Sequence, residues 1–193
     1  MQQHDPYSHL RPHVVWENAF SAAEVDAIVA LGDRLRLEKA TIAYRTGEAT
    51  ENPTRITRTA WIAQDAEAAW LYGKLERIIR AINNDIYRFD LTGFSDLLQY
   101  TVYHADEGGH FDWHVDQIPQ PALRKLSFSV QLTDPSEYEG CDLEIHAGTR
   151  IDRLSRAKGA VVAFPAYVIH RVTPIRRGTR KALVCWTAGP AFR

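Results

Sequence analysis

Apolar and polar residues alternate in two different rhythms along the chain, and the rhythm changes near residue 95. Before that point, apolar residues recur mainly at the three- and four-residue spacing of amphipathic helices. After it they recur at every second position, as in strands. Helices that precede a run of strands indicate segregated layers, because each layer buries its apolar face against the other. We therefore predict helices packed on the outside of a β core.

The first helix is marked by its start. Ser21 and Glu24 have the spacing of a capping box, and Phe20 and Val25 stand where a hydrophobic staple would form across the cap. These signals predict a helix over residues 22–35.

A second amphipathic helix is expected to begin after Asp65. Its apolar residues share one face at helical spacing. They are Leu71, Leu75, Ile78, Ile79 and Ile82. Two strands are expected between the helices, near 38–44 and 55–62, joined by the polar loop 45–54.

The second half of the chain contains short β-rich runs at regular intervals. These runs are 97–104, 109–116, 124–132, 141–146, 159–164, 167–172 and 180–187. Such spacing is typical of a sandwich or jelly roll. The clearest run alternates Leu126, Phe128, Val130 and Leu132 with Ser127, Ser129 and Gln131. Its polar face is predicted to meet either water or a polar cavity.

The composition is that of an ordinary globular protein, with 193 residues of which 45% are apolar and 24% charged. This length suits one domain whose core needs no disulfides. Cys141 and Cys185 are therefore expected to be reduced thiols, although they could in principle pair. The first residues lack the pattern of a secretory signal, and the longest apolar run, 159–169, is too short to span a membrane. We expect a cytoplasmic protein.

The formal net charge of −1 gives no overall attraction to nucleic acid or anionic lipid. Basic residues gather between 150 and 181, and acidic residues between 134 and 144. We interpret these segments as neighbouring solvated strands, since the basic segment lacks the interleaved aromatic residues that stack on bases. Arg171, Arg176 and Arg177 are accordingly expected to be exposed charges.

Candidate chemistry gathers where three histidines alternate with three aspartates. They are His104, Asp106, His110, Asp112, His114 and Asp116. On a strand, residues two apart point to the same side, so a His-x-Asp pair can direct an imidazole and a carboxylate at one metal ion. This argument applies equally to the pair that starts at His110 and the pair that starts at His114. A second metal site formed by His104, His110 and His146 has no strong support from spacing or strand parity.

The wider context of this cluster resembles a known family. Residues 103–116 read YHADEGGHFDWHVD, residues 138–143 read YEGCDL, and an HRVTP segment begins at His170, ten positions before Arg180. In this order the motifs resemble the Fe(II)- and 2-oxoglutarate-dependent dioxygenases, and most closely their prolyl 4-hydroxylase-like branch. The resemblance covers residues 97–188. Cys141 departs from it, because the branch usually has a second glycine there.

The resemblance implies a fold and a reaction. The fold would be a double-stranded β-helix, or jelly roll, in a single dioxygenase domain over 1–193, with 1–95 as helical and strand support and 96–193 as the catalytic core. The expected reaction hydroxylates an unactivated C–H bond with Fe(II), 2-oxoglutarate and O₂, releases succinate and CO₂, and uses ascorbate as reductant. The expected substrate is a prolyl-containing peptide or protein, or an amino-acid-like molecule.

The resemblance also assigns roles to residues. An aromatic residue three positions before the metal-binding histidine, here Phe111, selects His114 over His110. The implied iron ligands are His114, Asp116 and His170, the implied cosubstrate residues are Arg180, Tyr103 and Gln131, and Trp186 would form a wall of the iron site. Two histidines and one carboxylate hold Fe(II) on one side and leave three positions open. The planar guanidinium of Arg180 suits the distal carboxylate of 2-oxoglutarate, whereas its neighbour Lys181 should point away.

Two alternatives stay open, and one loop adds a hypothesis about the substrate. The chain could be a noncatalytic jelly-roll module that binds a metal such as Zn²⁺, or a demethylase of nucleic-acid bases. The demethylases of this superfamily place an arginine near the end of the final strand, where this chain has Thr187. The polar loop 45–54 stands where related prolyl hydroxylases carry a mobile loop, which suggests a lid over a peptide.

Overall fold

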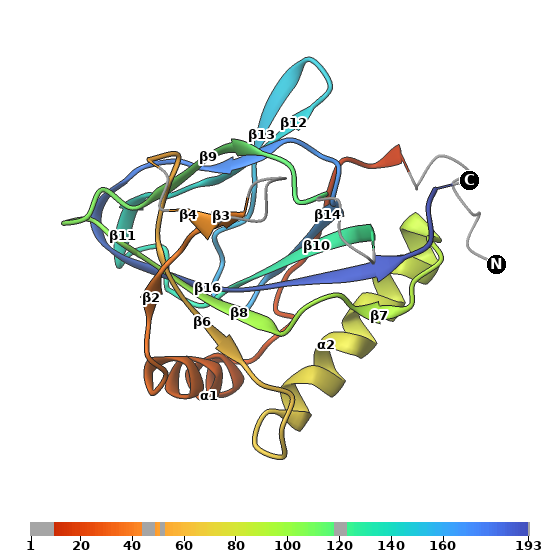
Figure 1. Ribbon diagram of the computed structural model, residues 1–193, viewed down its shortest axis with the longest axis horizontal. Helices are drawn as coiled ribbons and strands as arrows, with labels where there is room; N and C mark the ends of the chain where they lie inside the picture. The colour runs from red at the N-terminus through yellow and green to blue at the C-terminus, as the bar shows by residue number, and fades with distance from the viewer. Residues whose placement is uncertain (1–9, 44–48, 51–52, 118–122, 193) are drawn as a thin grey trace.

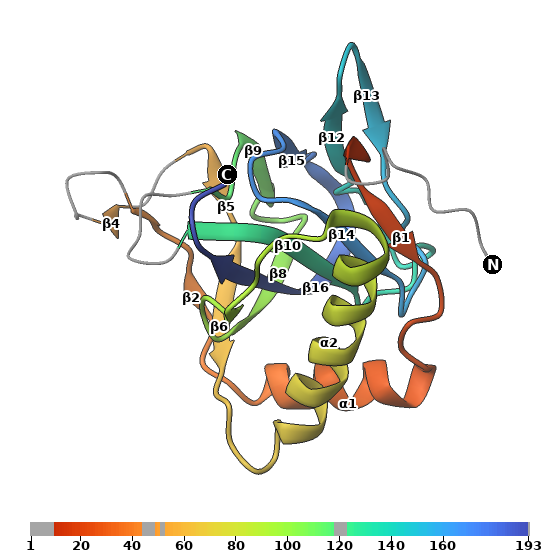
Figure 2. The same cartoon turned by 90° about the vertical axis from the view of Figure 1, so that its right-hand side faces the viewer.

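Two β sheets and two helices make three layers, with the larger sheet in the middle (Figure 1). The structure is a computed structural model that describes residues 10–43, 49–50, 53–117 and 123–192. Both helices lie on the side of the larger sheet that faces away from the smaller sheet, as the two views show (Figure 2). The double-stranded β-helix with helices packed outside is therefore confirmed.

In the described part of the chain, the larger sheet has nine antiparallel strands, in the order β1-β14-β10-β16-β8-β6-β2 with β11 and β7 also paired to β16. Their bounds are β1 Val14–Trp16, β2 Glu38–Lys39, β6 Arg58–Ile62, β7 Gly93–Phe94, β8 Leu98–His104, β10 Leu123–Gln131, β11 Tyr138–Gly140, β14 Val161–Pro165 and β16 Ile175–Gly189. Strands from both halves of the sequence thus share one sheet.

The smaller sheet has five strands within the described ranges, in the order β13-β12-β15-β9-β5. Their bounds are β5 Arg55–Ile56, β9 His110–His114, β12 Leu143–Ala147, β13 Arg150–Arg153 and β15 His170–Val172. A separate pair joins β3, Ile42–Ala43, to β4, Ala49–Thr50. The loop 45–54 that suggested a lid lies largely outside the described residues, and the lid stays a hypothesis.

Both predicted helices are present. Helix α1, Ala22–Asp33, starts with the predicted capping box: Glu24 N–H donates to Ser21 Oγ at 3.3 Å, and Ser21 N–H donates to Glu24 Oε2 at 2.8 Å. Helix α2, Ala69–Ile82, is followed directly by a π-helical turn over Asn83–Tyr87. Arg88 ends the turn at φ 55°, in the left-handed region. Neither helix combines the length and apolar character that crossing a bilayer requires.

The core has two parts. One lies between the helices and the larger sheet, where Val25 and Leu71 from the helices join Phe128 and Val130 of β10. The other lies between the two sheets and contains residues such as Ile145. The larger sheet therefore has an apolar layer on each side, and the opposite faces of its strands serve different neighbours.

Several strand boundaries differ from the prediction. The run 141–146 starts late, at Leu143, because Gly140 and Cys141 have φ values of 72° and 53°. Two successive left-handed residues turn the chain sharply, and the pairing with β16 shifts register at Glu139 and Gly140. Cys141 thus occupies a conformation that favours glycine. Among the described residues, Cys141 and Cys185 are both free and buried.

Candidate active site

A cavity of about 550 Å³ opens between the two sheets. Its walls combine Ser127 and Ser129 from β10, Arg180 from β16 and His114 from β9. The polar face of β10 therefore meets a polar cavity rather than water. A cavity of this size is typical of small-molecule sites.

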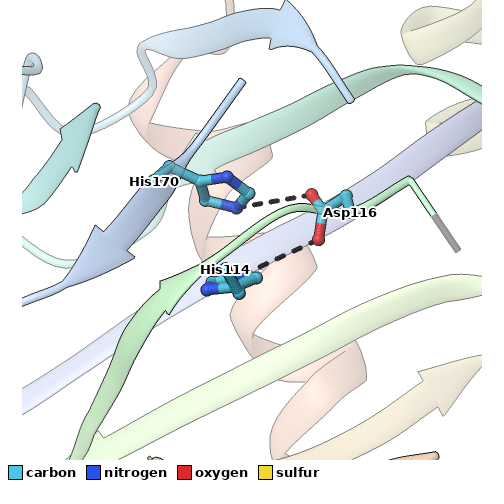
Figure 3. Close-up of side chains that lie close together, drawn as sticks. All are labelled: His114, Asp116 and His170. Atoms are coloured by element: carbon cyan, nitrogen blue, oxygen red, sulfur yellow. Dashed lines mark ion pairs between the residues drawn. The ribbon is translucent and has the colours of Figure 1, made fainter. Parts of the chain in front are cut away.

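Three side chains converge in this cavity, as Figure 3 shows. His114 is the last residue of β9, His170 is the first residue of β15, and the two are paired in register across the smaller sheet. Asp116 lies two residues beyond the end of β9. Its Oδ1 is 3.7 Å from His114 Nε2 and its Oδ2 is 3.4 Å from His170 Nε2. One potential ligand atom from each residue lies within 4.8 Å of the other two.

The backbone fixes which imidazole nitrogen faces the centre. His114 Nδ1 lies 2.7 Å from the carbonyl oxygen of Asp112, and His170 Nδ1 lies 2.9 Å from that of Val168. A carbonyl only accepts, so each Nδ1 carries the hydrogen and each Nε2 keeps its lone pair for a metal. The ring of Phe111 stacks on His114 with centroids 3.5 Å apart. The donor set and its orientation fit a divalent cation such as Fe(II).

Charge states support the same fit. Burial, together with the neighbouring His170, lowers the pKa of His114 to about 4. Burial alone would raise the pKa of Asp116, but His170, His114 and the hydroxyl of Ser127 hold it at about 2. Ser127 Oγ donates to Asp116 Oδ2 at 2.7 Å. At neutral pH the site therefore presents a neutral imidazole beside an ionised carboxylate, the states that bind metal.

Arg180 lies in the same cavity and is 3% exposed. Its Nη2 donates to Gln131 Oε1 at 2.7 Å, and its guanidinium carbon lies 5.6 Å from the centre of the Tyr103 ring. Arg180 forms no ion pair with any carboxylate of the described residues. Lys181 points away, as predicted, and its Nζ pairs with Asp33 of α1 at 2.7 Å.

The arrangement is matched by a family model. Residues 98–188 match the model of the 2OG-Fe(II) oxygenase superfamily, and this range contains the three converging side chains and Arg180. The matched segment, slightly under half of the chain, is therefore similar to the 2OG-Fe(II) oxygenase superfamily. Members of this superfamily use Fe(II), 2-oxoglutarate and O₂, typically with ascorbate.

The chain is similar to curated bacterial PKHD-type hydroxylases. The match to the protein of Pseudomonas fluorescens has 34% identity over 87 residues, covering 42% of this chain and 38% of that protein. The match to the protein of Acidovorax ebreus has 34% identity over 105 residues, covering 48% and 46%. The chain thus spans less than half the length of these relatives in the matched segments.

Solved structures of prolyl hydroxylases share the fold of this chain. A Pseudomonas putida prolyl-4-hydroxylase superposes with a TM-score of 0.74 at 20% identity, covering 94% of each chain. A Trichoplax adhaerens prolyl hydroxylase, solved with a hypoxia inducible factor peptide fragment, gives a TM-score of 0.75 at 16% identity, covering 93% of this chain and 84% of that chain. These likenesses show that the chain has the same fold as these prolyl hydroxylases.

Trp186 lines the cavity and is buried. Its buried indole N–H forms no hydrogen bond of normal geometry among the described residues, but it is close enough to Asp116 to help lower the pKa of that carboxyl. The guanidinium of Arg124 stacks on the Trp186 ring at 4.0 Å and pairs with Asp96 at 2.9 Å. Trp186 therefore lies beside the predicted metal ligands, at a wall of the site.

The other histidines lie apart from the three that converge. His110 Nδ1 faces the carbonyl of Gly108 at 2.8 Å, and its Nε2 faces the carbonyl of Pro53 at 3.1 Å. His104 contacts Thr179, and His146 is exposed against the ring of Trp113.

One charged residue differs from its prediction. Arg176 and Arg177 are exposed as expected, but Arg171 is half-buried. It pairs with Glu144 at 2.8 Å and covers the ring of Trp113 at 4.4 Å. The prediction of an exposed charge was wrong there, because strand pairing brings Glu144 directly opposite Arg171.

Sequence reasoning did not assign roles to two residues that the structure places at the site. Ser127 had a signal, since it belongs to the polar face of β10, and it holds Asp116. Arg55 had no local signal, because it enters the cavity only through the pairing of β5 with β9.

Proposed function

We propose that this protein is an Fe(II)- and 2-oxoglutarate-dependent hydroxylase in which His114, Asp116 and His170 bind the iron. The supporting observation is a two-His, one-carboxylate group in the same cavity as a buried Arg180 that lacks a carboxylate partner among the described residues. Such a group leaves three coordination positions for 2-oxoglutarate and O₂. The 1–193 chain would act as a single dioxygenase domain.

The balanced reaction converts R–H, O₂ and 2-oxoglutarate into R–OH, succinate and CO₂. When bound, Fe(II) supplies the activation of O₂, and one oxygen atom enters the substrate while the other enters succinate. Arg180 binds the distal carboxylate of 2-oxoglutarate through its planar guanidinium. Gln131 holds that guanidinium in place through its 2.7 Å contact, and Tyr103 covers it. Trp186 excludes water from the iron side of the cavity.

The proposed substrate is a prolyl-containing peptide or protein, or an amino-acid-like molecule. The peptide complex of the Trichoplax adhaerens neighbour supports a peptide or protein as the partner. Ascorbate is the proposed reductant, and a cytoplasmic location stays the prediction from the sequence.

The test is succinate formation from 2-oxoglutarate with Fe(II) and ascorbate, combined with a metal-binding titration. The wild-type protein should bind one iron and form succinate with a prolyl peptide pool. His114→Ala should lose both properties, and the matched control His110→Ala should keep the iron. Iron loss in His110→Ala but not in His114→Ala would contradict the ligand assignment.

The same assay separates the alternatives. A noncatalytic module would bind metal yet form no succinate with any pool. A base demethylase would release formaldehyde from methylated nucleic acid, whereas a hydroxylase of C–H bonds gives a product with one additional oxygen.

A further inference from the structure

Arg55 crosses the cavity beside the proposed iron site. It lies on β5 and pairs in register with Phe111 of β9. Its guanidinium carbon is 4.7 Å from the centre of the Phe111 ring, which itself stacks on His114. Its Nη2 donates to Gln99 Oε1 on β8 at 3.0 Å. A cationic group is therefore held one aromatic ring away from a proposed iron ligand.

The charge of Arg55 lacks a counterion in the described structure. Arg124, in the same cavity, pairs with Asp96, and Arg58, three residues further on, pairs with Glu107. Arg55 has only the neutral amide of Gln99, and its Nε is buried with no hydrogen-bond partner among the described residues. Burial lowers the pKa of Arg55, while Tyr103 and Asp116 favour its charged form. Leaving the buried Nε–H of Arg55 without an acceptor costs folding free energy, so this site suits a ligand that supplies a hydrogen-bond acceptor.

The cavity contains two guanidinium groups that have no carboxylate partner among the described residues, those of Arg180 and Arg55. Arg180 is buried between Gln131 and Tyr103, where the distal carboxylate of 2-oxoglutarate is proposed to bind. Arg55 instead bonds to Gln99, which pairs in register with Trp61, a cavity residue that is 45% exposed. The second cation therefore lies toward an exposed part of the cavity lining.

We propose that Arg55 binds a carboxylate of the primary substrate, so that the hydroxylated molecule is acidic close to the reacting carbon. This inference rests on the proposed function and names its substrate class. The free Nε–H and a terminal N–H of one guanidinium match the two oxygens of a carboxylate. One uncompensated positive charge also matches a single negative charge better than a phosphate group, which carries nearly two. A glutamyl or aspartyl side chain, or a free carboxyl terminus, meets this description.

The test measures binding without turnover. The protein is loaded with Mn(II) and 2-oxoglutarate without oxygen, and calorimetry records the affinity of capped tripeptides X-Pro-Z in which X and Z are Glu, Gln or Lys, and of the same peptides with a free carboxyl terminus. Peptides with a carboxylate should bind the wild type about 10- to 100-fold more tightly than their neutral counterparts. Arg55→Gln should remove this preference, and Arg55→Lys should keep part of it.

Arg58→Gln is the matched control, because Arg58 lies on β6, the next strand along the chain, and its Nε donates to Glu107 at 2.8 Å. It should keep the full preference for carboxylates, and thermal unfolding should show that each variant is folded. The proposal would be overturned if the wild type bound neutral or basic peptides as tightly as acidic ones or more tightly, or if it bound no peptide. A carboxylate preference that survives Arg55→Gln would also overturn it.

A second arm identifies the source of the carboxylate. Affinity for 2-oxoglutarate alone should stay within about 2-fold in Arg55→Gln, and a loss as large as in Arg180→Ala would assign Arg55 to the cosubstrate and overturn the inference. Succinate formation is scored separately. A carboxylate preference without succinate would refute the proposed function only, whereas succinate without that preference would refute the role of Arg55 only.

Discussion

The two faces of β10 differ in what they contact. Phe128 and Val130 point into the apolar layer beneath the helices, whereas Ser127 and Ser129 line the cavity and Gln131 holds Arg180. Both faces are buried, so burial alone does not distinguish them. The difference lies in the partners: one face packs against hydrocarbon and the other forms hydrogen bonds.

This division teaches that one strand can support stability and chemistry without mixing them. Because side chains alternate on a strand, a substitution at one position leaves the opposite face in place. The expected consequence is that variants of the two faces separate cleanly into loss of folding stability and loss of ligand binding.

The largest effect is expected on the apolar face. Phe128→Ala removes an aromatic ring that is 1% exposed, which should lower the free energy of unfolding by about 3–5 kcal/mol. Urea denaturation measures this loss. The folded fraction should bind 2-oxoglutarate with unchanged affinity, and a parallel loss of that affinity would break the separation of the two faces.

The next effect concerns the cosubstrate. Arg180→Ala removes a charge-assisted pair worth about 2–4 kcal/mol, so the affinity for 2-oxoglutarate should fall about 30- to 1,000-fold with metal binding intact. Lys181→Ala is the control, since Lys181 pairs with Asp33 on the helix side. Similar losses from both variants would indicate a diffuse basic patch instead of a specific anchor.

A smaller effect is expected from the polar face of β10. Ser127→Ala removes the hydrogen bond that orients Asp116, and loss of such an outer-shell partner typically costs about 10- to 100-fold in metal affinity. A competition titration with a chelator measures it. Ser129→Ala, on the same face but bonded to Gln131, should leave metal affinity unchanged. Equal losses would mean that general polarity, not one hydroxyl, supports the iron.

The smallest effect lies at the start of α1. Ser21→Ala should lower the free energy of unfolding by about 1 kcal/mol. The Lys74 hydrogen bond, with Ser21, lowers the pKa of Glu24 from 4.5 to about 2. A carboxylate with a depressed pKa stabilises the fold above its unfolded pKa, so this contribution should be present above pH 4.5 and lost as the pH falls toward 2. Glu24→Gln should weaken the dependence of the free energy of unfolding on pH between about 4.5 and 2. If that dependence were unchanged, Glu24 would not contribute to acid unfolding.

Local patterns predicted the parts of the fold that local chemistry determines. The capping box at Ser21 and the alternation along β10 involve residues close in sequence, and both are present. The side chains of His114 and Asp116 do lie close together, as predicted, but not because both residues lie on one strand. Strand β9 ends at His114, and Asp116 N–H instead donates to the carbonyl of Ala166 at 3.0 Å.

The parts that escaped prediction depend on partners far apart in sequence. Arg55 reaches the cavity because β5 pairs with β9, and the sequence around Arg55 contains no pattern that predicts this pairing. Short edge strands such as β1 and β13 were missed because each is defined by its neighbour rather than by its own alternation. The late start of β12 follows from the left-handed Cys141, a conformation that its residue type does not signal.

The length of β16 has a consequence for motion. Residues 182–184 of this strand pair with β8 on one side and with β10 on the other, so their amides lie in the interior of a sheet rather than at an edge. Hydrogen exchange at such amides requires the sheet to open around them, which makes them candidates for the slowest exchange in the molecule. The segment directly after Arg180 would then open only when the domain as a whole unfolds, which anchors one end of the backbone that carries this side chain.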